Sequence, residues 1–182
     1  MSITPGTHKL GPENGTLTVN TKRTGAAAKA GHDLRMQVER WEATLAIGED
    51  PSQSSLSVDA DADSLRVVQG SGGIQTLGED DKKNIKKTID DDVLKRDNIQ
   101  FRSSSVQAGE NGKLTVQGDL TIRGKTSAIT FDLAVGDNGM VSGTAVVKQT
   151  SHGMKPYSAL FGALKVADEV TVSIEECSLP SS

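Results

Sequence analysis

Three side chains in this sequence could carry acid–base or metal chemistry: His32, Asp33 and His152. Imidazole and carboxylate groups serve both as general acids or bases and as zinc ligands. Both histidines stand where predicted strands meet loops, so the fold could bring them together. Histidines beside glycine more often hydrogen-bond a loop or line a pocket. We therefore place His32 and His152 at the mouth of a pocket, and keep an acid–base set that includes Asp33 as the alternative.

A second acidic pattern, Asp59-Ala60-Asp61-Ala62-Asp63, resembles the opening of a calcium loop. Ser64 stands where such a loop needs glycine, and Gly70 stands where it needs a bidentate glutamate. Charges at a period of two are typical of the solvent face of a strand. We predict that this segment is a strand with its carboxylates in water, and we predict no metal and no cofactor.

Other catalytic signatures are missing from the sequence. It holds no nucleophile elbow, phosphate-binding loop, zinc-binding helix or Cys-x-x-Cys pair. Cys177 is the single cysteine, which excludes an intrachain disulfide and favours a structural role.

Charge and length bound the remaining function classes. The formal charge is -4 and there is no basic cluster, which argues against a nucleic-acid partner. The polar start without an apolar segment predicts a cytoplasmic protein, although removal of a signal peptide would leave the same sequence. We predict a flexible segment over residues 1–14 and a single domain over 15–177, and leave a homodimer open.

The clearest structural element is a hairpin within residues 112–137. Apolar residues alternate strictly on both sides of Arg123-Gly124-Lys125-Thr126. A two-residue turn at Gly124-Lys125 would set Leu120 opposite Ile129 and Gly118 opposite Phe131. A three-residue turn ending at Gly139 would then pair the second strand with a third. That register sets Val135 to Val141, Leu133 to Gly143, Phe131 to Ala145 and Ile129 to Val147, which turns Gly143 and Ala145 inward beside Phe131.

The same alternation predicts the other strands. They cover residues 15–22, 34–47 with a bulge near 39–40, 54–62, 65–68, 99–108 with a bulge at 103–105, and 169–177. One helix is predicted over Glu79–Leu94, where Ile85, Ile89 and Val93 form a thin apolar stripe suited to covering something. About eight antiparallel strands that alternate throughout indicate an all-β, closed eight-stranded barrel with one inserted α-helix.

The interior of this barrel is short of aromatic side chains, since the chain has one Trp, one Tyr and three Phe. Small inward residues near these rings indicate a cavity able to hold one apolar ligand. A packed core is the alternative, because rings in β proteins are usually core. The predicted ligand-binding residues lie on the strands and in the loop over residues 150–167: Met36, Trp41, Phe101, Phe131, Ala145, Val147, Met154, Tyr157 and Phe161.

Two segments, VQGDLTIRGKTSAITFDL (116–133) and YSALFGALKVADEVTVSIE (157–175), resemble the YceI-like family, as does Ile99-Gln100-Phe101 before them. The resemblance implies a lipocalin-like antiparallel barrel that binds polyisoprenoids or other long-chain lipids. It therefore implies non-enzymatic binding, storage or transport of an elongated apolar ligand. The alternatives are an enzyme that acts on such a ligand through His32, Asp33 and His152, and a packed barrel that serves as an interaction module.

Overall fold

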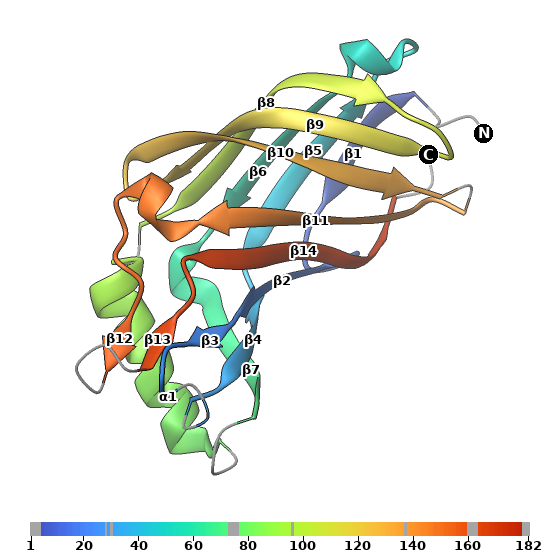
Figure 1. Ribbon diagram of the computed structural model, residues 1–182. Coiled ribbons are helices and arrows are strands. Elements are labelled where there is room, and N and C mark those ends of the chain that lie inside the picture. The colour runs from blue at the N-terminus through green and yellow to red at the C-terminus, as the bar shows by residue number, and fades with distance from the viewer. Residues whose placement is uncertain are drawn as a thin grey trace.

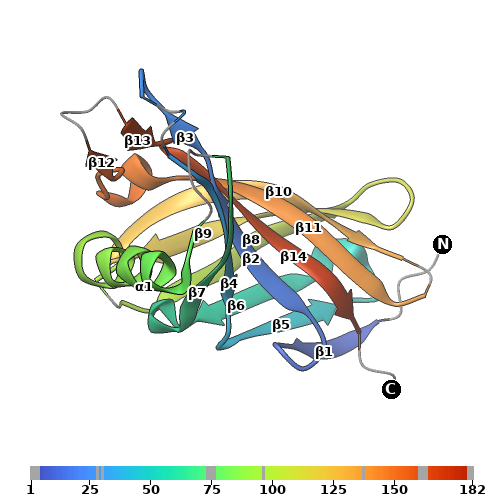
Figure 2. The ribbon, with the colours of Figure 1, turned by 90° about the horizontal axis from the view of Figure 1, so that it is seen from below.

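The computed structural model describes residues 5–27, 29, 31–72, 77–95, 97–136, 138–159 and 164–179. Within these ranges, eleven strands form one curled antiparallel sheet in the order β1-β5-β6-β8-β9-β10-β11-β14-β2-β4-β7 (Figures 1 and 2). Their bounds are β1 Gly6–Leu10, β2 Thr16–Thr21, β4 Asp33–Val38, β5 Trp41–Ile47, β6 Ser55–Ala60, β7 Leu65–Ser71, β8 Ile99–Ala108, β9 Lys113–Ile122, β10 Lys125–Val135, β11 Met140–Lys148 and β14 Glu169–Ser178.

The sheet closes on itself because several strands are halves of one long, bent strand. β4 and β5 are separated only by the bend at Glu39 and Arg40, where a bulge was predicted. β4 pairs with β2 and β7, while β5 pairs with β1 and β6. When β1/β2, β4/β5 and β6/β7 are each counted as one composite strand, these three and the five remaining strands form the closed eight-stranded barrel that the sequence predicts.

The N-terminal segment differs from the expectation. A flexible stretch was expected over residues 1–14, but Gly6–Leu10 forms β1 and pairs with β5 from Gly6↔Ile47 to Leu10↔Ala43. His8 and Leu10 alternate inward on this strand and are buried. The segment therefore extends one wall of the barrel.

The β9–β10 hairpin has the predicted faces but a different register. Its turn is Arg123-Gly124, with Lys125 paired to Ile122, so Leu120 faces Ser127 rather than Ile129. Arg123 and Gly124 have φ of 53° and 73°, as a type I′ turn requires. The pairing moves by two residues, which keeps every side chain on its predicted face. Gly118 therefore pairs with Ile129, and the ring that a side chain there would strike is that of Phe101, not Phe131.

The β10–β11 hairpin follows the predicted register and then separates. Val135 pairs with Val141 and Leu133 with Gly143, with Gly139 at φ 78° in the turn. A side chain at Gly143 would strike Leu133, so Leu133 fills the space that the glycine leaves. The ladder ends at Asp132↔Thr144, and the predicted pairs of Phe131 with Ala145 and of Ile129 with Val147 do not form.

The helix and the remaining strands gather at one end of the barrel. The helix α1 (Glu79–Thr88) continues as a π-helical turn over Ile89–Val93, which matches the predicted range. Beside it lies a small sheet of β12 (Ser158–Ala159), β13 (Leu164–Val166) and β3 (Arg23–Thr24), inside the segments that the sequence pattern left as loops (Figure 1). The 3-10 helices η2 Pro51–Gln53, η3 Ala62–Ser64 and η5 Gln149–His152 connect strands. No helix in the described ranges is long and apolar enough to cross a membrane.

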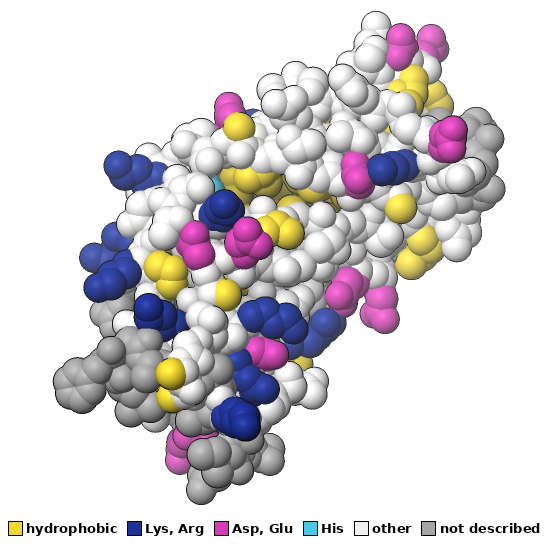
Figure 3. Space-filling view, viewed as in Figure 1, with side chains coloured by type: hydrophobic (Ala, Val, Ile, Leu, Met, Phe, Trp, Pro, Cys, Tyr) yellow, Lys and Arg dark blue, Asp and Glu magenta, His cyan; other side chains and the backbone are white. Residues whose placement is uncertain are grey.

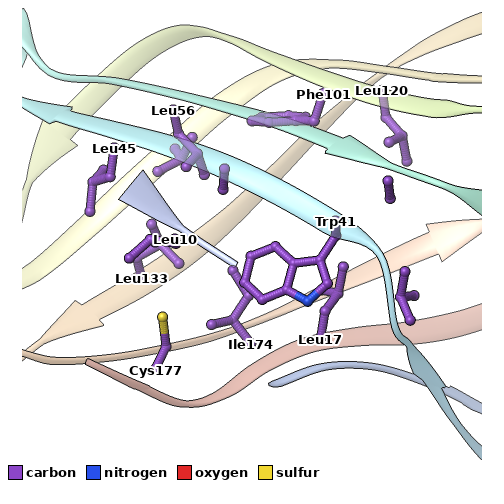
Figure 4. Close-up of a cluster of buried hydrophobic side chains, with 14 of the residues drawn as sticks. Leu10, Leu17, Trp41, Leu45, Leu56, Phe101, Leu120, Leu133, Ile174 and Cys177 are labelled. Carbon is purple, nitrogen blue, oxygen red and sulfur yellow. The ribbon is translucent and has the colours of Figure 1, made fainter. Parts of the chain in front are cut away.

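The opposite end of the barrel is packed. Trp41, Leu45 and Cys177 are buried there with side chains from neighbouring strands (Figure 4). Leu114 belongs to the same hydrophobic cluster. Leu114 has 0% and Leu45 1% of its surface exposed. The sulfhydryl of Cys177 lies against Gly15, where a side chain would collide with it. The hydrophobic core that closes this end is therefore continuous from β1 to β14.

Candidate functional site

The half of the barrel next to α1 encloses a cavity of about 560 Å³. Its wall is built from the inward positions of successive strands, because residues two apart on a strand share a face. The helix covers it with Ile85 and Ile89, as the predicted apolar stripe requires. Most of the lining is apolar and includes Leu17, Val19, Leu34, Met36, Val58, Phe101, Leu120, Ile129, Phe131, Ala145, Val147, Val170, Val172 and Ile174.

Most of the predicted ligand-binding residues border this cavity. Phe101 and Phe131 stand on β8 and β10 with ring centroids 5.3 Å apart and planes inclined by 58°. Met36, Ala145, Val147, Met154 and His32 also line it. Tyr157 lines it as well and is 49% exposed, so the cavity reaches the surface there, at what we call its mouth. Phe161 lies outside the described residues. The cavity thus collects side chains that the alternation pattern placed on one face.

Trp41 is inward-facing but does not line the cavity. Its ring lies beside Leu17 and Ile174, which line the cavity, at the boundary between the cavity and the packed end (Figure 4). Alternation fixes the face of a residue and says nothing about its position along the barrel axis. Trp41 therefore closes the inner end of the cavity instead of lining its wall.

The barrel wall is split beside the cavity. Beyond Asp132↔Thr144, β10 continues on β9 and β11 continues on β14, so residues 125–131 and 145–148 diverge. Ile129 and Phe131 on one side and Ala145 and Val147 on the other line the cavity. The space-filling view shows hydrophobic side chains in a hollow at the level of these strands (Figure 3). The split therefore gives the interior a lateral opening in addition to the mouth.

His152, which was predicted to lie at the mouth, is instead a buried tie within the wall. It is 1% exposed, with Nε2 3.0 Å from the Leu120 carbonyl and Nδ1 3.3 Å from the Lys148 carbonyl. A neutral imidazole can donate to one of these oxygens, and the contact with Leu120 is the shorter. His152 thus holds η5 against β9 and is absent from the cavity lining.

The acid–base set is not assembled by these contacts. The Asp33 carboxylate accepts a hydrogen bond of 2.8 Å from the Arg23 backbone N–H and lies 3.7 Å from Lys22 Nζ. His32 lines the cavity, but both ring nitrogens of His152 face backbone carbonyls of the wall. Within the described residues, no three His, Cys, Asp or Glu side chains are grouped as metal ligands.

Two carboxylates of the Asp59–Asp63 segment form ion pairs with arginines. Asp59 pairs with Arg102 at 3.0 Å and Asp61 with Arg40 at 2.9 Å. The predicted strand ends at Ala60, because Asp61 caps the short helix η3 by accepting from the Asp63 N–H. Burial raises the pKa of the Cys177 thiol, which makes it a poor nucleophile at neutral pH.

Several cavity residues escaped the sequence analysis. Leu34, Val58, Val170 and Val172 lie in the predicted inward phase, so alternation alone could have included them. Arg23 gave no such signal, because it follows a strand end and its partners are distant backbone carbonyls. It is one of the charged residues that line the cavity, and its guanidinium lies at the end of β7.

Comparison with known proteins places this geometry in a family. The model of the YceI-like domain matches residues 10–176, which covers nearly all of the barrel. A search of the curated proteins finds no match.

Solved structures share the fold at low sequence identity. BcnA of Burkholderia cenocepacia is 19% identical, with a TM-score of 0.66 over 88% of this chain and 93% of that one. The YCEI protein of Campylobacter jejuni is 16% identical, with a TM-score of 0.55 over 81% and 85%. A polyisoprenoid-binding domain from Saccharophagus degradans is 8% identical, with a TM-score of 0.50 over 92% and 98%. At these identities the likeness concerns the fold.

Proposed function

The chain belongs to the YceI-like domain family, and from this premise we propose that it binds one elongated apolar ligand inside the barrel without converting it. The observation that carries the proposal is the cavity of about 560 Å³, whose wall is lined mainly by apolar side chains. Pockets for small molecules typically span about 300 to 1,000 Å³ and are lined mainly by apolar side chains. A ligand of this kind would be shielded from water along most of its length.

The ligand class we propose is a polyisoprenoid or a fatty-acyl chain. The fold shared with the polyisoprenoid-binding domain supports the first, and the continuous apolar lining suits either. An enzyme acting through His32, Asp33 and His152 is less favoured, because the contacts of His152 and Asp33 are those of structural ties. Storage and transport are both compatible with this chemistry.

The test is to fill the cavity. Ala145 lines it, whereas the next residue, Val146, is 54% exposed on the outer face. Ala145→Phe should abolish uptake of isoprenoid and fatty-acyl chains, and Val146→Phe should bind them as the parent does. Mass spectrometry of solvent extracts from freshly purified parent would identify the native ligand.

The result that would overturn the proposal is a folded Ala145→Phe protein that binds these chains as tightly as the parent. Recovered chains should also have unchanged mass after incubation with the parent. A product that forms with the parent but not with His32→Ala or His152→Ala would favour the enzyme, because general acid–base groups contribute about 10² to 10⁴-fold in rate.

A further inference from the structure

Arg23 is fixed in place beside the cavity mouth. Its Nη1 donates to the Gly31 carbonyl at 2.9 Å and to the Ser71 carbonyl at 3.0 Å. Its backbone N–H donates to the Asp33 carboxylate. The guanidinium lies over Gly72, where any side chain would collide with it. The position of the charge is therefore set by the backbone on three sides.

These contacts leave one edge of the guanidinium available. Nη1 carries two protons, and the two carbonyls accept both. Nε and Nη2 have no hydrogen-bond or ion-pair partner in the described part of the chain. Their N–H groups lie side by side and form the edge that binds two oxygens of a carboxylate or a phosphate in parallel. Arg23 is one of the residues that line the cavity, in which a bound molecule would lie.

The charges around the mouth favour an anion. Arg23 and Lys165 are cations in the cavity lining, and Asp61, the carboxylate there, is paired with Arg40 at 2.9 Å. Asp33 is engaged by Lys22 and by the Arg23 backbone. Lys and Arg side chains gather over the end of the molecule that carries β3, β12 and β13 (Figure 3), although the whole chain has a formal charge of -4. On the face seen in Figure 3, this gathering of cations attracts anions.

We infer that the ligand is an anionic amphiphile whose apolar chain lies in the barrel and whose carboxylate or phosphate binds Nε and Nη2 of Arg23. The inference rests on the proposed function, because it assigns the polar end of the molecule that the cavity holds. Two charge-assisted hydrogen bonds form with an acid head group. An alcohol of the same chain length cannot reproduce them, because its single neutral oxygen cannot span both N–H groups.

The first measurement compares head groups on matched chains. Hexadecanoic acid is compared with hexadecanol, and geranylgeranyl phosphate with geranylgeraniol, by equilibrium dialysis below the micelle concentration. Hydrogen bonds to charged groups contribute about 1.5 to 3 kcal/mol, so the parent should bind at least one anion about tenfold to a hundredfold more tightly than its alcohol. The pair that shows the preference tells whether the source is a carboxylate or a phosphate.

The second measurement removes the paired Nε and Nη2 N–H groups of Arg23 by substitution. Arg23→Gln should weaken binding of the preferred anion by about tenfold to a hundredfold and leave the alcohol unchanged. Arg23→Lys keeps the charge but loses the paired N–H groups, so it should retain part of the preference. Arg66→Gln is the control, because Arg66 pairs with Glu39 on the outer surface.

The outcomes separate the two proposals. Equal binding of anion and alcohol by the parent, or a preference that survives Arg23→Gln, overturns the anion site while the apolar cavity stands. Binding of neither chain overturns the proposed function and the anion site with it. If Arg23→Gln does not fold, the head-group comparison on the parent and the Arg23→Lys variant decide.

Discussion

The two halves of the barrel share the strands β8 to β11 and β14 but are stabilised in different ways. At the end next to the termini, inward side chains such as Leu45, Leu114 and Val116 are at most 1% exposed and fill the interior. At the end next to α1, the inward side chains surround a cavity, and hydrogen bonds hold segments of the wall together. Gln149 Nε2 donates to the Ala167 carbonyl, His152 contacts the Leu120 carbonyl, and Arg23 contacts two carbonyls.

The difference shows how one sheet can enclose both a packed hydrophobic core and a cavity for a ligand. Burial of apolar surface is the main stabilising term. Both halves contribute to it, since side chains such as Leu17, Met36 and Phe101 line the cavity and are still buried. The hollow half lacks packing partners across its interior, so it needs hydrogen bonds to fix η5, β3 and β13. Hydrogen bonds within the wall hold it in place without filling the barrel interior.

The largest expected effect is on the free energy of unfolding, when a leucine is changed to alanine in the packed half and in the hollow half. Leu114→Ala should lower the free energy of unfolding by about 2 to 5 kcal/mol, because it opens a void in a packed region. Leu34 lines the cavity and is partly exposed, so Leu34→Ala should cost about 1 to 2 kcal/mol. Urea denaturation of the ligand-free proteins measures both. Equal losses would contradict a division into packed and hollow halves.

The same two leucine substitutions should affect ligand affinity in the reverse order. Leu34→Ala should weaken binding of an apolar chain, whereas Leu114→Ala should leave it unchanged in protein that remains folded. The buried thiol of Cys177 serves as a folding control, since its reaction with a thiol reagent should stay slow until the packed half opens.

The next prediction compares the unfolding free energies of variants at two buried histidines, one in each half. His152→Leu should cost about 1 to 3 kcal/mol of unfolding free energy, because it leaves the Leu120 carbonyl without its donor. His8 lies in the packed half with an Nε2 that has no partner among the described residues. His8→Leu should therefore be neutral or stabilising. Thermal unfolding checks the pair, and a loss at His8 as large as that at His152 would show that both halves depend on polar ties.

The sequence predicted the faces of the strands better than their register. Alternation fixes only the parity of a pairing, so the β9–β10 hairpin could move by two residues and keep Leu120 and Phe131 inward. The turn was misplaced because its first left-handed residue is Arg123, a residue type that gives no turn signal.

The sequence predicted an apolar cavity and several of its lining residues, but not how far the cavity extends along the barrel. Phe101, Phe131 and Ala145 were found because small and aromatic residues alternate in one phase. Trp41 shares that phase but lies in the other half, and phase carries no information on depth. Arg23 and His152 could not be placed, because their partners are backbone carbonyls at Ser71 and Leu120, which no side-chain pattern records.

The smallest expected effect concerns a carboxylate that holds η5 to the start of β14. Asp168 accepts hydrogen bonds from the Thr150 hydroxyl at 2.7 Å and from the Thr150 N–H at 2.8 Å. The Thr150 hydroxyl foremost, and then its backbone N–H, hold the pKa of Asp168 below its usual value. A lowered folded pKa means that the stabilisation is complete above the unfolded pKa, about 3.9, and is lost as the pH falls through the lower folded value.

Asp168→Asn should therefore lower the urea midpoint slightly at pH 6, and the difference from the parent should shrink below about pH 4. Thr150→Val removes the hydroxyl while keeping the backbone donor, so it should produce part of the same pH-dependent difference. A difference between Asp168→Asn and parent that stays constant from pH 6 to about pH 3 would mean that the carboxylate charge does not contribute, and that the hollow half is held by neutral hydrogen bonds alone.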